Sequence, residues 1–253
     1  MGWTRHQVRL LICAIQFLTR VPTPRLATFS PDWITRSARY FPLVGQGVGA
    51  ASAFVLILAE RAWSAPVAAV LAIMAGALIT GAFHEDGLAD TADGLGGGHT
   101  AERRLEIMKD SRIGTYGACA LVLALALKGA VLASIPVGTA AVMLLSAHGL
   151  GRAVAVVVMR ATPYAPSGEA SKWKPVPDGV RTSEVLVAIG IASWPLVLLP
   201  PDVALAGLAM GGVLTVALVL LARRLIGGHT GDVLGAVEQV FEVGFLLGAA
   251  ALA

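Results

Sequence analysis

Long apolar stretches dominate the chain, and short segments that carry Pro, Gly or charged residues separate them. Seven stretches are uncharged or nearly so and approach the roughly 20 residues that one bilayer crossing requires. The shortest of them, 185–201, also holds a proline. We therefore expect an all-α fold, a polytopic transmembrane helical bundle of about seven spanning helices. The expected spans are 41–59, 62–83, 113–135, 137–159, 185–201, 203–222 and 233–252.

The composition excludes a soluble fold. Hydrophobic residues make up 56% of the 253 positions and charged residues only 14%, whereas soluble domains carry about 25% charged residues. The mean hydropathy is +0.76. A chain of this length holds the expected spans and leaves no room for a separate soluble domain, so we expect 1–253 to form a single integral membrane domain. Its first part, 1–40, is expected to be a cytoplasmic or interfacial segment.

The N-terminal segment combines basic residues with the apolar run LLICAIQFL. A secretory signal has a longer apolar run and a small-residue cleavage site. Here Gln16 interrupts the run, Arg20 follows it at once, and no such cleavage site is present. The pattern predicts an amphipathic helix that lies in the membrane interface.

Lysine and arginine are distributed very unevenly between the two sides of the expected bundle. Cytoplasmic loops are enriched in these residues, so the asymmetry predicts a multi-pass protein of the cytoplasmic (inner) membrane, with the N terminus and the longer loops in the cytoplasm. The net charge of +3 then reflects topology and contact with anionic membrane lipids, and no nucleic-acid partner is expected. Arg61 is alone on one side, and the other side has Arg5, Arg9, Arg20, Arg25, Arg36, Arg39, Arg103, Arg104, Lys109, Arg112, Arg160, Lys172, Lys174, Arg181, Arg223 and Arg224.

An acidic segment, HEDGLADTADGLGGG, follows the second expected span. On a helix, Asp86, Asp90 and Asp93 occupy positions i, i+4 and i+7 of one face. Three like charges on one face are destabilising unless a cation binds them, and carboxylate oxygens are suited to magnesium or manganese. His84 and Glu85 are candidates for further ligands or neighbouring contacts. The alternative is a solvated acidic helix end, with His84 as a simple cap.

The residues that follow the aspartates predict a phosphate-binding element. GLGGG at Gly94–Gly98 indicates a glycine-rich turn whose backbone, at Gly96 and Gly97, approaches a phosphate closely. Further along, KDSRIGTYG supplies Lys109 and Arg112 as cationic clamps. Together with the aspartates, these features predict a metal–diphosphate site.

Several charged residues lie inside the expected spans. Charge at membrane depth is costly and usually functional, although ion pairs across the bundle are an equally good interpretation, since members of the set share helix faces. Asp232 opens the last span and is expected at the depth of the aspartate triad. The charged residues within the spans are Lys128, Arg152, Glu238 and Glu242, and His148 lies one helical turn before Arg152.

Nearly the whole chain resembles one known family, the adenosylcobinamide-GDP ribazoletransferases, also called cobalamin (5′-phosphate) synthases. The two acidic landmarks are specific to this resemblance when they occur together. The landmarks are FLTRVP at Phe17–Pro22, YFPLVGQGVGA at Tyr40–Ala50, HEDGLADTADGLGGG at His84–Gly98, MKDSRIGTYG at Met108–Gly117, GR at Gly151–Arg152 and GDVLGAVEQVFE at Gly231–Glu242.

The resemblance implies a late step of vitamin B12 assembly. Adenosylcobinamide-GDP reacts with α-ribazole, or its 5′-phosphate, to give adenosylcobalamin, or its 5′-phosphate, and GMP. Magnesium, or manganese, held by the aspartates with Glu85 would bind the diphosphate, and one of the aspartates, Asp232 or Glu242 would take the hydroxyl proton. Substrate-binding roles are expected for His84, Gly96, Gly97, Lys109, Arg112 and Arg152. Assembly as a homo-oligomer or with other enzymes of the pathway is also expected.

Two other functions fit part of the pattern. A CDP-alcohol phosphotransferase of lipids also uses an Asp-rich helix, but DGLAD at Asp86–Asp90 has Asp where that family has Arg, and the later aspartates come much sooner. An ion-coupled transporter would use charges at the bilayer midplane, such as Lys128 and Arg152, but the chain shows no second copy of the acidic segment. The segment 161–184 is interpreted either as a substrate cover or as an ordinary connection.

Overall fold

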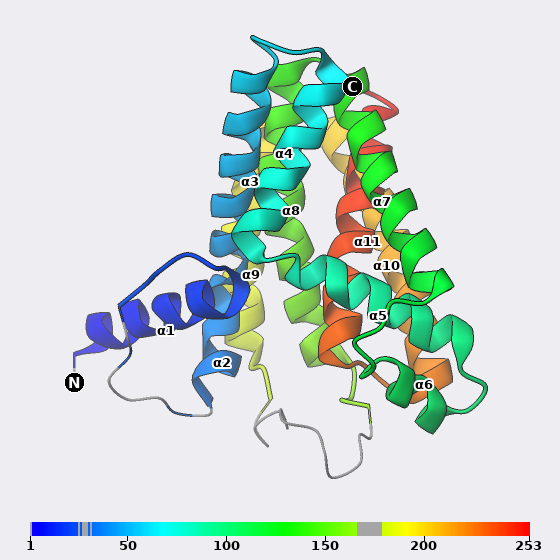
Figure 1. Ribbon diagram of the computed structural model, residues 1–253. Helices are drawn as coiled ribbons and strands as arrows, with labels where there is room; N and C mark the ends of the chain where they lie inside the picture. Colours follow the sequence, from blue (N-terminus) through cyan, green and yellow to red (C-terminus); the bar gives the residue numbers. More distant parts are fainter. Residues whose placement is uncertain (1, 25, 27–29, 31, 166–178) are drawn as a thin grey trace.

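Helices form nearly all of the computed structural model, which describes residues 2–24, 26, 30, 32–165 and 179–253. Long helices build an upright bundle, and α1, α5 and α6 run at an angle to these long helices (Figure 1). Among the described residues there is no β-strand. The helices are α1 (Trp3–Leu18), α2 (Asp32–Ser37), η1 (Ala38–Tyr40), α3 (Phe41–Ala59), α4 (Ala65–Thr80), α5 (Phe83–Gly97), α6 (Ala101–Ile107), α7 (Thr115–Ser134), α8 (Val137–Ala161), α9 (Thr182–Ser193), η2 (Trp194–Leu198), α10 (Pro201–Ile226) and α11 (Gly231–Ala250).

The helix ends follow local sequence signals. Proline occupies the first turn of α3, α4 and α10, where its missing N–H has no intrahelical partner to lose. α4 and α10 end at Gly81 and Gly227, which adopt the left-handed conformation that glycine adopts without steric cost. The hydroxyl groups of Thr100 and Thr230 accept hydrogen bonds from backbone N–H groups in the first turns of α6 and α11.

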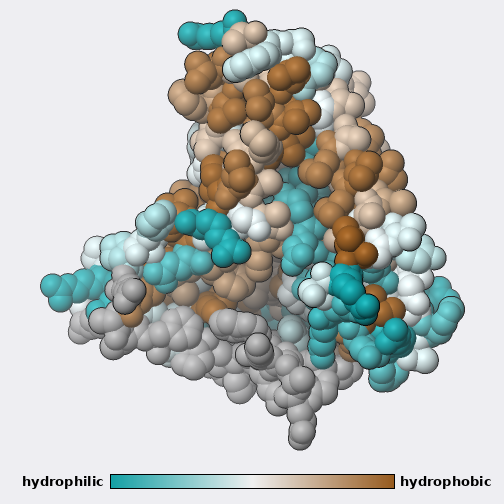
Figure 2. Space-filling model, viewed as in Figure 1, coloured by the Kyte–Doolittle hydropathy of each residue, from teal (hydrophilic) through white to brown (hydrophobic). Residues whose placement is uncertain are grey.

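The surface of the bundle is that of a membrane protein. Large apolar side chains on α3, α4, α7 and α10 are exposed, among them Phe54, Leu78, Val122 and Leu205, each about two-thirds exposed. Figure 2 shows apolar side chains over the bundle and hydrophilic ones around α6. Exposed apolar area on this scale is expected of a surface in contact with lipid. The predicted all-α transmembrane class is therefore confirmed.

The predicted number of about seven spans is not confirmed. Counted over the described residues, five helices have the length and hydropathy to cross a membrane, and α4 with α5 adds a sixth only as a bent pair. The expected span at 62–83 corresponds to α4, which has 16 residues and ends at Thr80, where the chain turns. The apolar stretch of α9 and η2 is shorter, 182–198, and it contains the break at Trp194 and Pro195. The predicted N-terminal helix is confirmed as α1.

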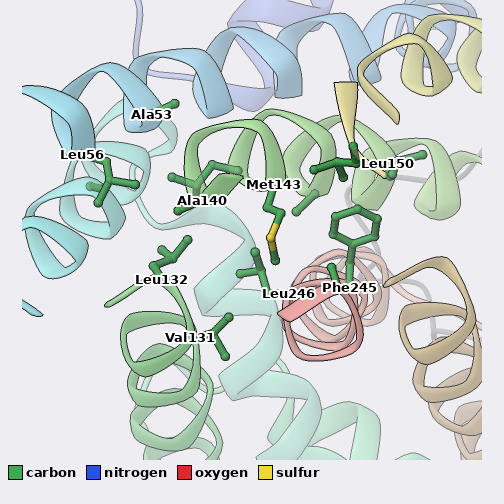
Figure 3. Packing of buried hydrophobic residues seen from close by; sticks show 14 of the residues in the cluster. Ala53, Leu56, Val131, Leu132, Ala140, Met143, Leu150, Phe245 and Leu246 are labelled. Carbon is green, nitrogen blue, oxygen red and sulfur yellow. The ribbon is translucent and has the colours of Figure 1, made fainter. Parts of the chain in front are cut away.

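The core lies where α3, α8 and α11 pack together with α7. Met143 and Leu150 of α8 point toward Phe245 and Leu246 of α11 in the apolar layer of Figure 3, and all four are buried. α11 lies in the centre of the bundle, since it is in contact with α5, α7, α8 and α10. Any polar side chain on α11 is therefore surrounded by other helices and not by lipid. Residues 166–178 of the segment 161–184 lie outside the described residues. The interpretation of this segment as a substrate cover therefore stays a prediction.

Candidate active site

The acidic segment forms a helix of its own because the chain bends sharply before it. Gly81 and Ala82 both have positive φ, 69° and 57°, and α5 leaves α4 at an angle of 91°. The N–H of Arg20, just after α1, donates to the carbonyl of Ile79 at 2.7 Å and satisfies an acceptor at the end of α4. A non-glycine residue with positive φ is strained. Because of the bend, α5 lies across the bundle and does not continue along α4 (Figure 1).

A glycine contact brings α5 against the start of α11. A β-carbon added to Gly87 would lie 2.8 Å from the backbone oxygen of Asp232 and 3.1 Å from the α-carbon of Gly235. Only glycine allows two backbones to approach this closely. The contact lies next to Asp86, and Asp86 and Asp90 both interact electrostatically with Asp232 in the first turn of α11. Asp232 was expected at the depth of the aspartate triad, and its electrostatic interaction with Asp90 is consistent with that expectation.

Four carboxylates influence one another at this crossing. Asp90 lies on α5, outside the membrane-spanning helices, and its pKa is raised to about 7 by partial burial and then by the negative charges of Asp86, Asp232 and Asp93. Between described residues, no ion pair joins a lysine or arginine to any of the four. The acidic cluster, defined as Asp86, Asp90, Asp93 and Asp232, therefore carries negative charge that no lysine or arginine of the described residues pairs with. That deficit favours binding of a cation with a preference for oxygen ligands.

Asp93 has a second role at the far end of α5. Its two oxygens accept backbone hydrogen bonds from Gly114 at 2.7 Å and Gly117 at 2.8 Å, at the start of α7. A carboxylate there satisfies free N–H groups and interacts favourably with the helix dipole. Asp93 thus attaches α7, and the loop before it, to the acidic helix. Each of its oxygens retains a lone pair for a further interaction.

The predicted glycine-rich turn at Gly94–Gly98 is wrong, because α5 continues to Gly97. Tertiary packing explains the helix. A β-carbon at Gly94 would clash with the side chain of Met108, and one at Gly96 would lie 2.8 Å from the ring of Tyr116. These glycines give room to residues that follow α6 and open α7. Gly97 is more open, with its nearest neighbour, an Ile107 methyl carbon, 3.6 Å from such a β-carbon.

The two predicted cationic clamps lie on the loop that Asp93 anchors. Lys109 is exposed. Arg112 forms an exposed ion pair with Asp110, with 2.6 Å between the guanidinium and carboxylate atoms. Hydrogen bonds from Arg112 lower the pKa of Asp110 to about 2. An exposed pair of this kind is weak, so Arg112 is free to exchange Asp110 for a phosphate.

The charges within the spans form a second, buried group, as predicted for ion pairs across the bundle. Glu242 contacts Lys128 at 2.5 Å and the Nδ1 atom of His148 at 2.7 Å. Arg152 contacts Glu238 at 2.5 Å. Asp232 lies ten positions before Glu242, which places Glu242 about 15 Å deeper along α11. The predicted site residues are thus divided between the acidic cluster and this buried network.

A metal ion in the buried network is disfavoured by its own cations. Among the described residues, the only group of three or more His, Cys, Asp or Glu side chains with all ligand atoms within 4.8 Å of one another is His148, Glu238 and Glu242. The carboxylates of this group already pair with Lys128 and Arg152. The aspartates of the acidic cluster do not approach one another this closely in any set of three, so a metal-ligand role for them stays a prediction.

The start of α5 connects the two groups. His84 is buried, and its backbone packs against Gly235 of α11. Glu85 accepts a hydrogen bond of 3.2 Å from the amide of Gln239, so it points toward the buried network. Sequence reasoning missed Gln239. The available signal was a polar residue between Glu238 and Glu242 on the apolar last helix.

Comparisons with known proteins show the family of the chain. The family model described as Cobalamin-5-phosphate synthase matches residues 10–250. A protein of Leptothrix cholodnii named adenosylcobinamide-GDP ribazoletransferase is 42% identical over 96% of this chain and 95% of its own length. Proteins with that name from Shewanella pealeana and Shewanella amazonensis are each 43% identical, over 94% and 96% of this chain and 93% and 95% of their own. No solved structure matches. The chain is a transferase that belongs to the cobalamin-5-phosphate synthase family.

Proposed function

We propose that the protein transfers the adenosylcobinamide-phosphate group of adenosylcobinamide-GDP to α-ribazole, or its 5′-phosphate, and releases GMP. The names of its relatives support these substrates. The observation that carries the proposal is the crossing of α5 and α11 at Gly87, which gathers carboxylates that form no ion pair with a described lysine or arginine. A basic loop is attached to the same helix through Asp93. This combination is suited to a metal–diphosphate complex.

Magnesium, or manganese, fits the acidic cluster by charge and by donor chemistry. Asp86 and Asp90 are the residues that would hold the ion, with Asp93 and Asp232 beside them. When bound, the ion would neutralise diphosphate oxygens and the charge that develops on the leaving phosphate. Glu85 is not proposed as a direct ligand, since one of its oxygens accepts from Gln239.

The chain's own residues orient the donor and remove one proton. The 5′-hydroxyl oxygen of the acceptor forms a bond to the phosphorus attached to cobinamide, and the bond from that phosphorus to the bridging oxygen breaks, so GMP leaves with the electron pair. Lys109 and Arg112 bind the phosphate oxygens of the leaving group. Asp232 takes the hydroxyl proton. Glu242 is not proposed for this role because it lies about 15 Å deeper in the bundle.

The distribution of basic residues supports a membrane orientation with the acidic cluster on the cytoplasmic side. α7 and α11 begin, and α8 and α10 end, at the end of the bundle that carries the acidic cluster. The basic residues of those connections, such as Arg160, Arg223 and Arg224, lie there too. Under the positive-inside rule this end faces the cytoplasm of an inner membrane. We also propose contacts with anionic lipids, and assembly as a homo-oligomer or with other enzymes of cobalamin synthesis.

Product identity tests the proposal. Purified protein in lipid nanodiscs receives adenosylcobinamide-GDP, α-ribazole and magnesium, and the products are separated by chromatography. We expect GMP and a cobalamin in equal amounts. CMP formed from CDP-diacylglycerol would instead indicate a lipid phosphotransferase. Substrate flux into proteoliposomes without GMP release would indicate a transporter.

A further inference from the structure

Gln239 is the point at which the buried network touches the acidic helix. Its Nε2 atom donates to Glu85 of α5 at 3.2 Å and to Glu238 at 2.9 Å. Its Oε1 atom accepts from the Nζ atom of Lys128 at 2.7 Å. The side chain is 2% exposed. One amide therefore joins helices α5, α7 and α11.

The chemistry of its neighbours fixes the orientation of this amide. A lysine ammonium group only donates hydrogen bonds, and an ionised carboxylate only accepts them. The Gln239 oxygen must therefore face Lys128, and its NH2 group must face Glu85 and Glu238. A flipped amide would oppose donor to donor and acceptor to acceptor. No other uncharged side chain of similar size provides both functions in this arrangement.

The amide supplies what the glycine contact between α5 and α11 lacks. Contact at Gly87 lets the helices approach, and the bond from Gln239 to Glu85 opposes rotation of the first turn of α5 about its axis. Asp93 holds the other end of α5 against α7, and each residue of a helix corresponds to about 100° of rotation. Glu85 directly precedes Asp86, so a hold on Glu85 sets the direction of the next carboxylate. Lys128 in turn is held by Glu242, which makes the anchor rigid.

We propose that Gln239 is a positioning residue that sets the rotation of α5, so that Asp86 and Asp90 face Asp232. The assignment rests on the proposed transfer reaction for its catalytic consequence. Gln239 touches neither substrate nor metal in this role. It acts through Glu85, and the buried network serves as its fixed support.

The test uses a size-matched exchange at both ends of the bond. Gln239→Glu keeps the acceptor for Lys128 and replaces the donor with a second acceptor, which repels Glu85 and Glu238. Adding Glu85→Gln restores a donor and acceptor between the two positions. Gln46→Glu is the matched control, because Gln46 is also a buried glutamine, but its hydrogen bonds among the described residues go to Ile191 of α9 and Trp194 and not to α5.

Two measurements on protein in nanodiscs separate positioning from folding. In hydrogen exchange without substrate, Gln239→Glu is expected to speed exchange of the α5 amides, the double variant to slow it again, and Gln46→Glu to leave it unchanged. In GMP release, Gln239→Glu is expected to lower kcat about 100-fold, the size of effect that a misplacement of about 1 Å produces. Its KM for the nucleotide substrate changes little, and the double variant regains most of the lost kcat.

Three results would overturn the assignment. The first is unchanged hydrogen exchange of the α5 amides in Gln239→Glu, and the second is an unchanged kcat in that variant. The third is a double variant that recovers slow exchange but not activity, because that result would give Glu85 a direct catalytic role. If Gln239→Glu does not fold, Glu85→Ala is used instead, because Glu85 is only partly buried and its removal breaks the same hydrogen bond. This variant must also speed hydrogen exchange of the α5 amides. If the wild type releases no GMP, the proposed function fails, while the exchange measurement still decides the hold on α5.

Discussion

Arg152 is the residue whose removal the bundle should tolerate least. Its guanidinium contacts Glu238 at 2.5 Å, Glu242 at 3.5 Å and the backbone oxygen of His148 at 2.8 Å, and its side chain is 2% exposed. In the buried network the two basic side chains Lys128 and Arg152 pair with the two glutamates Glu242 and Glu238. Arg152→Met keeps most of the volume and removes the cation that faces Glu238.

We expect a large loss of stability because the carboxylates that Arg152 contacts are buried, and water cannot replace the lost cation. Breaking a buried ion pair from one side costs about 3–5 kcal/mol. For a chain of this size each kcal/mol corresponds to roughly 2–4 °C in Tm, so Arg152→Met is expected to lower Tm by about 10 °C. Removing both partners leaves no unpaired charge, and the double variant Arg152→Met with Glu238→Gln should recover much of that loss.

The Tm of both variants is measured by thermal unfolding in one detergent. The scan rate is kept fixed because membrane proteins often unfold irreversibly. Glu238→Gln alone completes a double-mutant cycle, and a coupling of about 2 kcal/mol or more between Arg152 and Glu238 is expected. A Tm of Arg152→Met within about 2 °C of the wild-type Tm would show that the buried ion pair does not stabilise the bundle. So would simple additivity of the two substitutions, because the pair would then not be a unit.

Three further predictions concern α5. Gly87→Ala places a β-carbon 2.8 Å from a backbone oxygen of α11 and should lower GMP release at least about 10-fold by separating the helices; Gly212→Ala, where nothing lies within 4 Å, is the control and should match the wild type. Asp93→Asn should cost about 1–3 kcal/mol in thermal unfolding, because an amide has one acceptor atom for two N–H groups; equal stability would contradict its role in holding α7. The pKa of Asp90 is raised from 3.8 to about 7 in the folded protein, so the folded state binds more protons than the unfolded state between these values, and without magnesium stability should fall as the pH rises from about 4 to 7; Asp90→Asn should flatten that slope, and an unchanged slope would argue against the raised pKa.

Much of the fold was predictable because hydrophobic length and helix periodicity are local properties. Apolar runs located α3, α7, α8, α10 and α11 to within a few residues. The spacing of Asp86, Asp90 and Asp93 predicted one helix, and α5 holds all three. Ion pairs across the bundle were one of the two interpretations of the charges within the spans, and the structure contains them.

The remaining features depend on contacts between distant segments. The 91° bend arises from left-handed backbone at Gly81 and Ala82, and a periodic apolar pattern contains no information about where a helix axis turns. Glycine propensity indicated a turn after Asp93, but packing against residues near α6 and α7 keeps that segment helical. Gln239 was overlooked because its neighbours Lys128 and Glu85 are more than 100 residues away in the chain.

The central claim is that Asp86 binds a divalent ion that the transfer of adenosylcobinamide phosphate requires. The direct measurement is a magnesium titration of GMP release from adenosylcobinamide-GDP plus α-ribazole, with wild type and Asp86→Asn purified in nanodiscs and matched for Tm. The account predicts saturable magnesium dependence in the wild type and a loss of about 100-fold or more in Asp86→Asn, as expected when charge stabilisation of the transition state is removed. GMP release that is equal in the two proteins, or independent of magnesium in the wild type, would contradict it.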